Sequence, residues 1–293
     1  MSVVVTTLRP MLVSSGPLRP DSDKYAFEVK WDGFRALVHA SGGRIHVVSR
    51  NGNDMTHRYP ELHALGEALE QDVVLDGEIV ALGDDGNPDF AALWFRDRSG
   101  PDYRPARLCF MAFDVLACAG EDLTQRPYSE RRAALEQLRV DGPHWCTPPS
   151  HVGDGAALFA ATRRMGLEGV VAKRRDSRYR PGLRTKSWTK TKHMQSRSFA
   201  LLGWIPPEEW RGDRGCVVVG LRTELGIAVA GWVESGYGRE LVDELPQLTR
   251  TELEEHRAPQ RLWTRPTTIV GEIRFLEWSA AGGLRHATVV SWG

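Results

Sequence analysis

The sequence predicts an α+β protein of two domains, in which antiparallel or mixed sheets are followed by a small β-barrel. Two observations support this class. The chain has 293 residues, a length that suggests about two domains. Strand-like and helix-like segments are interleaved over the first two-thirds, whereas strands dominate after about His193. We therefore expect a first domain over residues 1–194 and a second over residues 195–293.

Apolar runs and alternating patterns predict the strands of the first domain. The predicted strands cover residues 26–31, 34–41, 44–50, 73–82, 108–117 and 169–174. In FEVKWDGFRALVHA, apolar residues alternate on both sides of Asp32-Gly33, which is a turn pair typical of a β-hairpin. Strands that come as hairpins predict antiparallel or mixed sheets and not a doubly wound fold.

Three segments of the first domain predict helices: residues 60–71, 129–140 and 155–166. The first opens at Pro60, and proline is favoured at the first helical position. Ser129 is the expected N-cap of the second, because a serine hydroxyl can accept a hydrogen bond from the first turn.

The second domain is expected to contain three strands, one helix and two further strands, in that order. The strands cover residues 198–206, 216–223, 227–235, 269–278 and 284–292, and the helix covers residues 239–257. This is the order of a five-stranded OB-fold β-barrel. A small β-sandwich is the alternative.

Composition limits the function classes. The 38 Lys and Arg residues balance 38 Asp and Glu residues, so any affinity for nucleic acid must come from a local patch. The four cysteines form no C-x-x-C pair, which predicts reduced thiols in a cytoplasmic protein and argues against a zinc site or a disulfide framework. No apolar run reaches about 18 residues, so we expect no membrane span and no signal peptide.

Two short segments place charged residues where strands are expected. Lys30 precedes Asp32-Gly33 and Arg35 follows it, so two cations flank one turn. They are either solvated side chains or the two sides of an anion site. Asp76 and Glu78 fall on one face of a predicted strand, because side chains repeat every two residues; the alternative is an Asp-Gly turn with surface acids.

A basic run follows the acid Glu168. Residues 173–192 contain nine Lys or Arg residues and one acid, Asp176. Lys190 and Lys192 alternate, so both should point to one face of a strand. A solvated basic face is the usual interpretation of such a run. This run lies between two predicted domains, however, where ligand clefts commonly form.

Taken together, these segments resemble the ATP-dependent DNA ligases of the covalent nucleotidyltransferase superfamily, especially the short bacterial enzymes related to the ligase module of end-joining systems. The resemblance covers nearly the whole chain, with the family's order and spacing of motifs. The matching segments are KWDGFR (the pattern K-x-D-G-x-R), VVSRNG, LDGE, FMAFDVL, EGVVAKR and SWTKTK. The first domain is then expected to be an adenylation domain.

The resemblance implies a three-step reaction. Lys30 attacks the α-phosphate of ATP, AMP moves from Lys30 to a DNA 5′-phosphate, and the neighbouring 3′-hydroxyl displaces AMP. An amine attacks only without its proton, and neighbouring cations such as Arg35, Lys190 and Lys192 disfavour the ammonium form. The same cations stabilise charge on the transferring phosphate.

The resemblance also assigns nine further residues to the site. At the base and sugar it places Glu28 at the adenine edge, Phe113 stacked on adenine, and Arg35 and Arg50 near the ribose and phosphates. It places Lys190 and Lys192 at the α-phosphate, and Arg184 in the lining of the pocket ahead of the segment SWTKTK. Glu78 and Glu168 are the expected metal ligands, Glu78 alternatively binding the ribose hydroxyls, and Mg²⁺ or Mn²⁺ suits such an all-oxygen site.

Both ends of the chain depart from the larger family members. Only 29 residues precede Lys30, which leaves no room for a helical DNA-binding domain. We therefore expect modest affinity for nicked or broken duplex DNA, or help from a DNA-end-binding partner, and a monomeric enzyme. Gly293 lies where the arginine of a sixth motif, R-x-D-K, is expected, so self-adenylylation should be slow.

Three other functions share parts of this pattern. A GTP-dependent mRNA-capping guanylyltransferase also uses K-x-D-G-x-R and an OB domain, but EGVVAKR and SWTKTK look ligase-like. An RNA ligase would use the same chemistry. A non-catalytic nucleic-acid-binding module with a relic nucleotide pocket is favoured only by the missing sixth motif.

Overall fold

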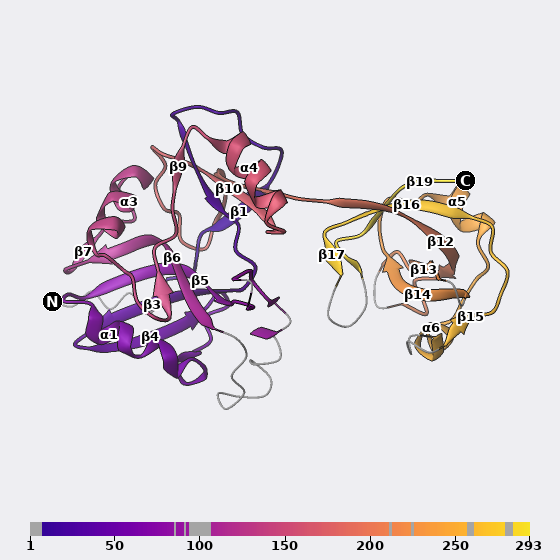
Figure 1. Ribbon diagram of the computed structural model, residues 1–293, viewed down its shortest axis with the longest axis horizontal. Helices are drawn as coiled ribbons and strands as arrows, with labels where there is room; N and C mark the ends of the chain where they lie inside the picture. The colour runs from indigo at the N-terminus through magenta and orange to yellow at the C-terminus, as the bar shows by residue number, and fades with distance from the viewer. Residues whose placement is uncertain are drawn as a thin grey trace. The chain divides into compact units, whose positions relative to one another are not determined.

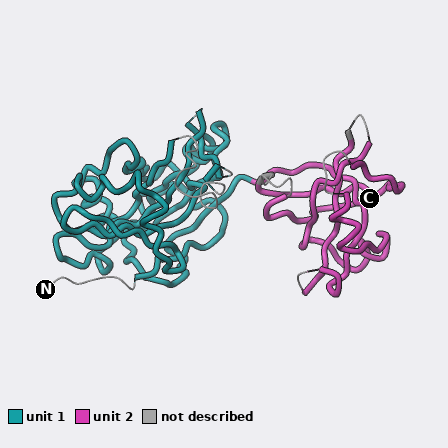
Figure 2. Tube along the Cα trace, turned by 90° about the horizontal axis from the view of Figure 1, so that it is seen from below, with its two compact units in different colours: residues 1–193 teal, residues 194–293 magenta. Residues whose placement is uncertain are grey.

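The computed structural model describes residues 8–84, 86–90, 92–93, 107–210, 213–223, 226–256, 261–278 and 284–293 (Figure 1). The chain divides into two compact units, Met1–His193 and Met194–Gly293, which Figure 2 colours separately. No helix in the described ranges is both long enough and apolar enough to cross a membrane.

The first sheet of unit 1 has five strands and is mixed, as the sequence predicts. Its order is β1-β11-β10-β2-β9. Only the outer pair β1–β11 is parallel. Helix α4 (Gly155–Arg164) packs against β10 and β2. The strands are β1 (Leu12–Ser15), β2 (Tyr25–Val29), β9 (His151–Val152), β10 (Gly169–Arg174) and β11 (Arg184–Lys192).

The second sheet of unit 1 has the order β4-β3-β5-β6-β7, with β8 parallel to β6. Helix α3 (Tyr128–Gln137) packs against β6. The strands are β3 (Phe34–Ser41), β4 (Arg44–Ser49), β5 (Val73–Ala81), β6 (Leu108–Cys118), β7 (Glu121–Asp122) and β8 (Trp145–Cys146).

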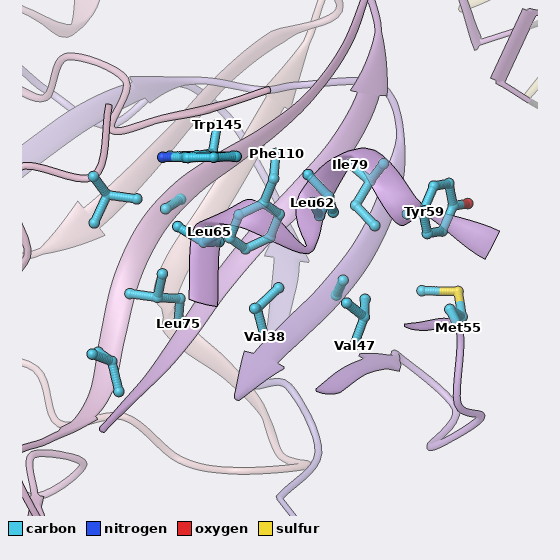
Figure 3. Close-up of a cluster of buried hydrophobic side chains, with 14 of the residues drawn as sticks. Val38, Val47, Met55, Tyr59, Leu62, Leu65, Leu75, Ile79, Phe110 and Trp145 are labelled. Atoms are coloured by element: carbon cyan, nitrogen blue, oxygen red, sulfur yellow. The ribbon is translucent and has the colours of Figure 1, made fainter. Parts of the chain in front are cut away.

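The larger core of unit 1 lies on one face of this second sheet. Strand residues such as Val38 and Phe110 pack there against Leu62, Leu65 and Trp145 (Figure 3). Residues two apart on a strand share a face, so the alternate positions of β5 and β6 face the opposite way. Glu78 of β5 and Phe113 of β6 lie on those opposite faces.

The predicted hairpin at Asp32-Gly33 is wrong. Strand β2 lies in the first sheet and β3 in the second, so the chain crosses between sheets at this point. Gly33 is needed for a different reason, since a Cβ there would collide with the carbonyl oxygen of Ile79 on β5. LDGE is likewise no turn, because it lies within β5.

Two of the three predicted helices of unit 1 differ in detail. The segment 60–71 is a 3₁₀ turn, η2 (Pro60–Leu62), followed by the short helix α1 (Ala64–Ala68), and Pro60 does begin the turn. A preceding 3₁₀ turn, η1, covers Thr56–Arg58. Ser129 is not an N-cap, because α3 begins at Tyr128.

The reason lies in the segment that follows β10. The backbone N–H of Tyr128 donates to the carbonyl of Ser177, and that of Ser129 donates to the carbonyl of Arg175. These carbonyls satisfy first-turn donors of α3 that a capping side chain would otherwise bind.

The described part of unit 2 contains eight strands: the predicted strands 269–278 and 284–292 are each divided into two, and β15 was not predicted. The order of its sheet is β15-β14-β13-β12-β16-β19. A separate two-stranded sheet pairs β17 (Glu277–Trp278) with β18 (Leu284–Arg285). The strands of the larger sheet are β12 (Gln195–Ile205), β13 (Cys216–Thr223), β14 (Gly226–Val233), β15 (Leu262–Trp263), β16 (Val270–Phe275) and β19 (Thr288–Trp292).

The single helix predicted over residues 239–257 is wrong. The structure has two short helices, α5 (Arg239–Glu244) and α6 (Arg250–His256), and Arg257 lies outside the described residues. Pro246 has no N–H and disfavours a helical residue before it. The chain between the helices instead exchanges backbone hydrogen bonds with Trp204 of β12.

Candidate active site

A cavity of about 180 Å³ lies in unit 1. Segments from both sheets line it, including the residues that precede and follow the crossover at Gly33. Eight of the ten site residues predicted from the sequence line this cavity: Glu28, Lys30, Arg35, Arg50, Glu78, Phe113, Arg184 and Lys190. The other two lie next to it: Glu168 forms an ion pair with Lys30, and Lys192 pairs with the same carboxylate.

Lys30 directly follows β2, and its backbone N–H donates to the carbonyl of Gly169 at 2.9 Å. Its side chain donates to one carboxylate oxygen of Glu168. Lys192 Nζ lies 2.6 Å from the other oxygen. Gly169 permits this geometry, because its φ is +146° and a Cβ there would collide with the carbonyl oxygen of Thr191 on β11.

The electrostatics of this group favour an anionic ligand. Burial opposes the ionisation of Glu168, but Lys30 and Lys192 outweigh it and hold the pKa of Glu168 below its ordinary value. Burial lowers the pKa of Lys190, and repulsion from Lys192 and Lys30 adds to this. Lys30 and Lys192 pair with one carboxylate, and Lys190 adds a third positive charge, so a phosphate group can neutralise the excess.

Arg35 is fixed at the wall of the cavity by a buried clamp. Its guanidinium donates to both oxygens of Asp76, at 2.5 and 2.6 Å. The hydroxyl of Tyr179 donates to Asp76 at 2.6 Å and accepts from the backbone N–H of Met11 at 2.9 Å. Burial opposes the charge on Arg35, but Asp76 outweighs it and raises the pKa of the guanidinium. Arg35 therefore stays cationic. Its guanidinium carbon, Cζ, lies 4.5 Å from the ring centre of Phe113.

A second buried network surrounds Glu28. Lys173 Nζ lies 2.7 Å from one oxygen of Glu28 and donates to the carbonyl of Phe113 at 3.0 Å. The hydroxyl of Tyr128 donates to the other oxygen of Glu28. Burial lowers the pKa of Lys173 although Glu28 opposes this. Lys173 also lies 4.4 Å from the ring centres of both Phe113 and Trp188.

Sequence reasoning did not assign a role to Lys173, Asp76, Tyr128 or Tyr179. A signal for Lys173 was present, since it follows Val171 by two residues on β10 and shares its face; both line the cavity. The two tyrosines gave no local signal. Their partners lie 100 or more residues away along the chain.

The site fits a weakly coordinated divalent cation and not a closed protein cage. Among the described residues there is no group of three or more His, Cys, Asp and Glu side chains that could hold a metal ion. Mg²⁺ needs only one or two carboxylates when it keeps several waters and binds nucleotide phosphates. Glu78 on the cavity wall and Glu168 beside Lys30 supply carboxylates of that kind.

Glu78 is expected to make stability depend on pH. Burial raises its pKa from 4.5 to about 7, with Arg35 and Lys30 opposing the shift. The folded chain thus binds this proton more tightly than the unfolded chain, and stability is lost as the pH rises from about 4.5 through about 7. Glutamine does not titrate. The unfolding free energy of Glu78→Gln should therefore increase relative to that of the wild type as the pH rises from 5 to 8.

Urea unfolding of the ligand-free chain at these two pH values measures the difference. Glu67→Gln, on the exposed part of α1, is the matched control. A stability difference between Glu78→Gln and the wild type that stays constant over this range would contradict the prediction.

Comparison with known proteins gives concordant results. Residues 10–192 match the family model described as ATP dependent DNA ligase domain. The multifunctional non-homologous end joining DNA repair protein LigD of Mycobacterium tuberculosis is 38% identical over 293 residues. That alignment covers 96% of this chain but 38% of LigD, so the chain spans about two-fifths of that relative's length.

Three further comparisons cover most of both proteins. DNA ligase C of M. tuberculosis is 33% identical over 272 residues, which are 86% of this chain and 74% of that protein. The crystal structure of the ligase domain of M. tuberculosis LigD has a TM-score of 0.62 and 34% identity, and covers 99% of this chain and 96% of that one. A mycobacterial DNA ligase D complexed with ATP and MES gives a TM-score of 0.63 at 34% identity, over 98% of this chain and 95% of that one. With a site in which a lysine, its acidic partner and further cations surround one cavity, the chain belongs to the family of ATP-dependent DNA ligases.

Proposed function

We propose that this chain is an ATP-dependent DNA ligase module that seals nicks or broken ends through a lysyl–AMP intermediate on Lys30. One observation carries the proposal. The ε-amine of Lys30 lies at the cavity beside a carboxylate that it shares with Lys192, and Lys190 lines the same cavity. This arrangement supplies a nucleophile, a proton acceptor and cations for a phosphate.

In the first step, the amine of Lys30 attacks the α-phosphorus of ATP. A nitrogen–phosphorus bond forms, and the bond from phosphorus to the pyrophosphate oxygen breaks. Glu168 is hydrogen-bonded to this amine and is placed to take its proton. Lys190 and Lys192 stabilise the negative charge that moves onto the leaving oxygens.

Two later steps complete the reaction. A DNA 5′-phosphate takes AMP from Lys30, and the neighbouring 3′-hydroxyl then displaces AMP to form the new phosphodiester bond. Mg²⁺ or Mn²⁺, bound by Glu78 and Glu168, would neutralise phosphate charge during these transfers. Arg50 and Arg184 lie at the cavity wall, where they can contact the phosphates.

The remaining cavity residues suit the nucleoside. Glu28, held between Lys173 and Tyr128, offers a hydrogen-bond acceptor to the exocyclic amine of adenine. Phe113 offers a ring for stacking, and Arg35 is held next to that ring for the ribose and phosphates. Glu28 would repel the carbonyl that guanine presents at the same edge, which supports ATP over GTP.

We propose that unit 1 is the adenylation domain and that unit 2 is an OB-fold domain that binds duplex DNA. The five main strands of unit 2 run β14-β13-β12-β16-β19, with the helices between the third and fourth strand in sequence. This connectivity supports a partly open five-stranded barrel. The names of the LigD relatives support a role in DNA repair and end joining. For such a role we propose a DNA-end-binding protein as partner.

Phe113→Ala is expected to weaken ATP binding by about 1–3 kcal/mol, the usual range for losing a base–aromatic stack. The measurement is titration of the Lys30→Ala variant with ATP, with and without the second substitution, so that adenylylation does not interfere. Phe110→Leu, on the opposite face of β6, is the control. An unchanged ATP affinity would show that Phe113 serves only the core.

Labelling tests the proposed function directly. The chain is incubated with Mg²⁺ and ATP or GTP labelled in the α-phosphate, then denatured and separated by electrophoresis. Label from ATP supports the ligase, label from GTP supports a capping enzyme, and no label supports a non-catalytic binding module. Sealing of nicks with DNA or RNA strands then distinguishes DNA ligase from RNA ligase.

A further inference from the structure

Three sulfur atoms gather on β6 and β8 in unit 1. The Sγ atoms of Cys109 and Cys146 lie 4.0 Å apart, and Cys146 Sγ lies 3.3 Å from the Sδ atom of Met111. Cys109 and Met111 are buried, whereas Cys146 is half-buried and all the cysteines are free. The proposed function uses none of these side chains.

This sulfur cluster (Cys109, Met111 and Cys146) is connected to the nucleotide cavity through neighbouring residues. Cys109 and Met111 follow the alternation that places Phe113, a cavity-lining residue, on the same face of β6. Met111 is the cross-strand partner of Glu78, which also lines the cavity. Trp31, which follows Lys30 in sequence and lines the cavity, packs against the buried cluster of Val80, Cys109 and Met111.

The backbone disfavours a disulfide between the two thiols. In the parallel β6–β8 pair, Cys146 is opposite Met111, so Cys109 is a diagonal neighbour two residues away. Strand spacing and rise put the Cα atoms of such neighbours about 8 Å apart, whereas a disulfide needs less than about 7 Å. Closing the bond would require the strands to shift.

A shared metal ion fits the spacing of the two cysteine sulfurs better. Bonds of about 2.3 Å from one ion to two sulfurs at a trigonal angle separate those sulfurs by about 4 Å, which is the separation of Cys109 and Cys146; the Met111 sulfur, 3.3 Å from Cys146, would have to turn outward to join them. Thiolates and thioethers are soft ligands, which Cu(I), Zn²⁺ and Fe–S clusters favour, and three donors do not complete the four-coordinate shell of structural Zn²⁺, which leaves Cu(I). We propose that Cys109, Cys146 and Met111 form a binding site for one Cu(I) ion beside the ATP cavity.

Binding follows a simple proton balance. Each thiol releases one proton to solvent as its sulfur bonds the ion, and the neutral thioether completes the set. The product carries one net negative charge. The half-buried Cys146 is the more accessible of the two cysteines and can receive the ion first.

Occupancy should lower self-adenylylation, and this half of the inference rests on the proposed function. The ion would tie β8 to β6 and fix Met111 opposite Glu78. It would also restrict Trp31, next to the nucleophile. Cu(I) would therefore act as an inhibitor that competes with neither ATP nor DNA for a contact.

The experiment measures Cu(I) binding first and activity second. The full chain is titrated anaerobically with Cu(I) held by a competing chelator, and intact mass gives the stoichiometry. Wild type is expected to bind one ion. Cys109→Ser and Cys146→Ser should each lower affinity by at least about 100-fold, and Met111→Leu by about 10-fold, in line with losses caused by disturbed metal sites.

Cys118→Ser on the same strand and Cys216→Ser in unit 2 are the matched controls and should bind Cu(I) as wild type does. Wild-type affinity in Cys109→Ser or Cys146→Ser would overturn the site. So would a mass loss of two hydrogens on exposure to Cu(II), which would instead show the disulfide.

ATP labelling of Lys30 is then measured with and without bound Cu(I). Wild type should lose labelling as the site fills, whereas Cys146→Ser should keep its own metal-free rate. Binding of one ion without loss of labelling would overturn the inhibition but not the site. A chain that never labels contradicts the proposed function and leaves the binding result standing.

Discussion

Replacement of Lys30 by alanine or by arginine is expected to abolish the covalent loading of AMP. Alanine removes the nucleophile. Arginine keeps the positive charge beside Glu168, but its guanidinium stays protonated at neutral pH and has no free electron pair to attack phosphorus. Both variants should therefore show no labelled protein after incubation with labelled ATP, although arginine preserves the ion pair.

Lys186→Ala is the matched control, because Lys186 is an exposed lysine of β11 in the same basic run and does not line the cavity. It should load AMP normally. Adenylate that survives denaturation in either Lys30 variant would mean that another residue is the nucleophile. Normal circular dichroism of the variants separates loss of chemistry from loss of the fold.

Asp114→Asn is expected to cost unit 1 about 3–5 kcal/mol of unfolding free energy, because it leaves a buried charge without its partner. Arg131 donates to both oxygens of Asp114 at 2.8 Å, and both side chains are fully buried. Asparagine keeps the volume but removes the negative charge that compensates the guanidinium. Urea unfolding measures the loss in the transition that belongs to unit 1.

Asp176→Asn is the control for this prediction. Asp176 also pairs with an arginine, Arg174, at 2.6 Å, but both side chains are exposed. Water replaces a lost partner at such an exposed site. The unfolding free energy of Asp176→Asn should therefore equal that of the wild type within error. A loss in Asp114→Asn no larger than in this control would show that the buried pair contributes little.

Local patterns predict the strands, whereas most of the cavity residues follow from the resemblance to the ligases. Alternation is a property of a few neighbouring residues, so β3, β4, β5, β6 and β10 follow from it directly. Lys190 and Lys192 share β11, as their spacing predicts. The ordered motifs then bring Lys30, Glu28 and Phe113 to one cavity, although each motif alone is compatible with a surface turn or a solvated charge.

The errors come from pairing partners far away in sequence. Nothing within FEVKWDGFR reveals that β2 pairs with β10 and β3 with β5, so a hairpin is the natural local interpretation. The burial of Lys173 or Asp76 likewise depends on an opposite charge or hydroxyl from another segment. The prediction of Ser129 as an N-cap is wrong for the same reason. The backbone N–H of Ser129 donates to the carbonyl of Arg175, which comes from a distant segment.

The parallel pairing of β1 with β11 determines when unit 1 can be completed during synthesis. β1 leaves the ribosome well before its hydrogen-bonding partner, which begins at Arg184. Leu12 and Val13 line the cavity from β1, and Lys190 lines it from β11. A nascent chain that ends before β11 thus presents an unpaired strand and an open pocket wall. The nucleotide pocket can therefore be completed only after β11 has been synthesised, and β1 must remain until then without pairing elsewhere.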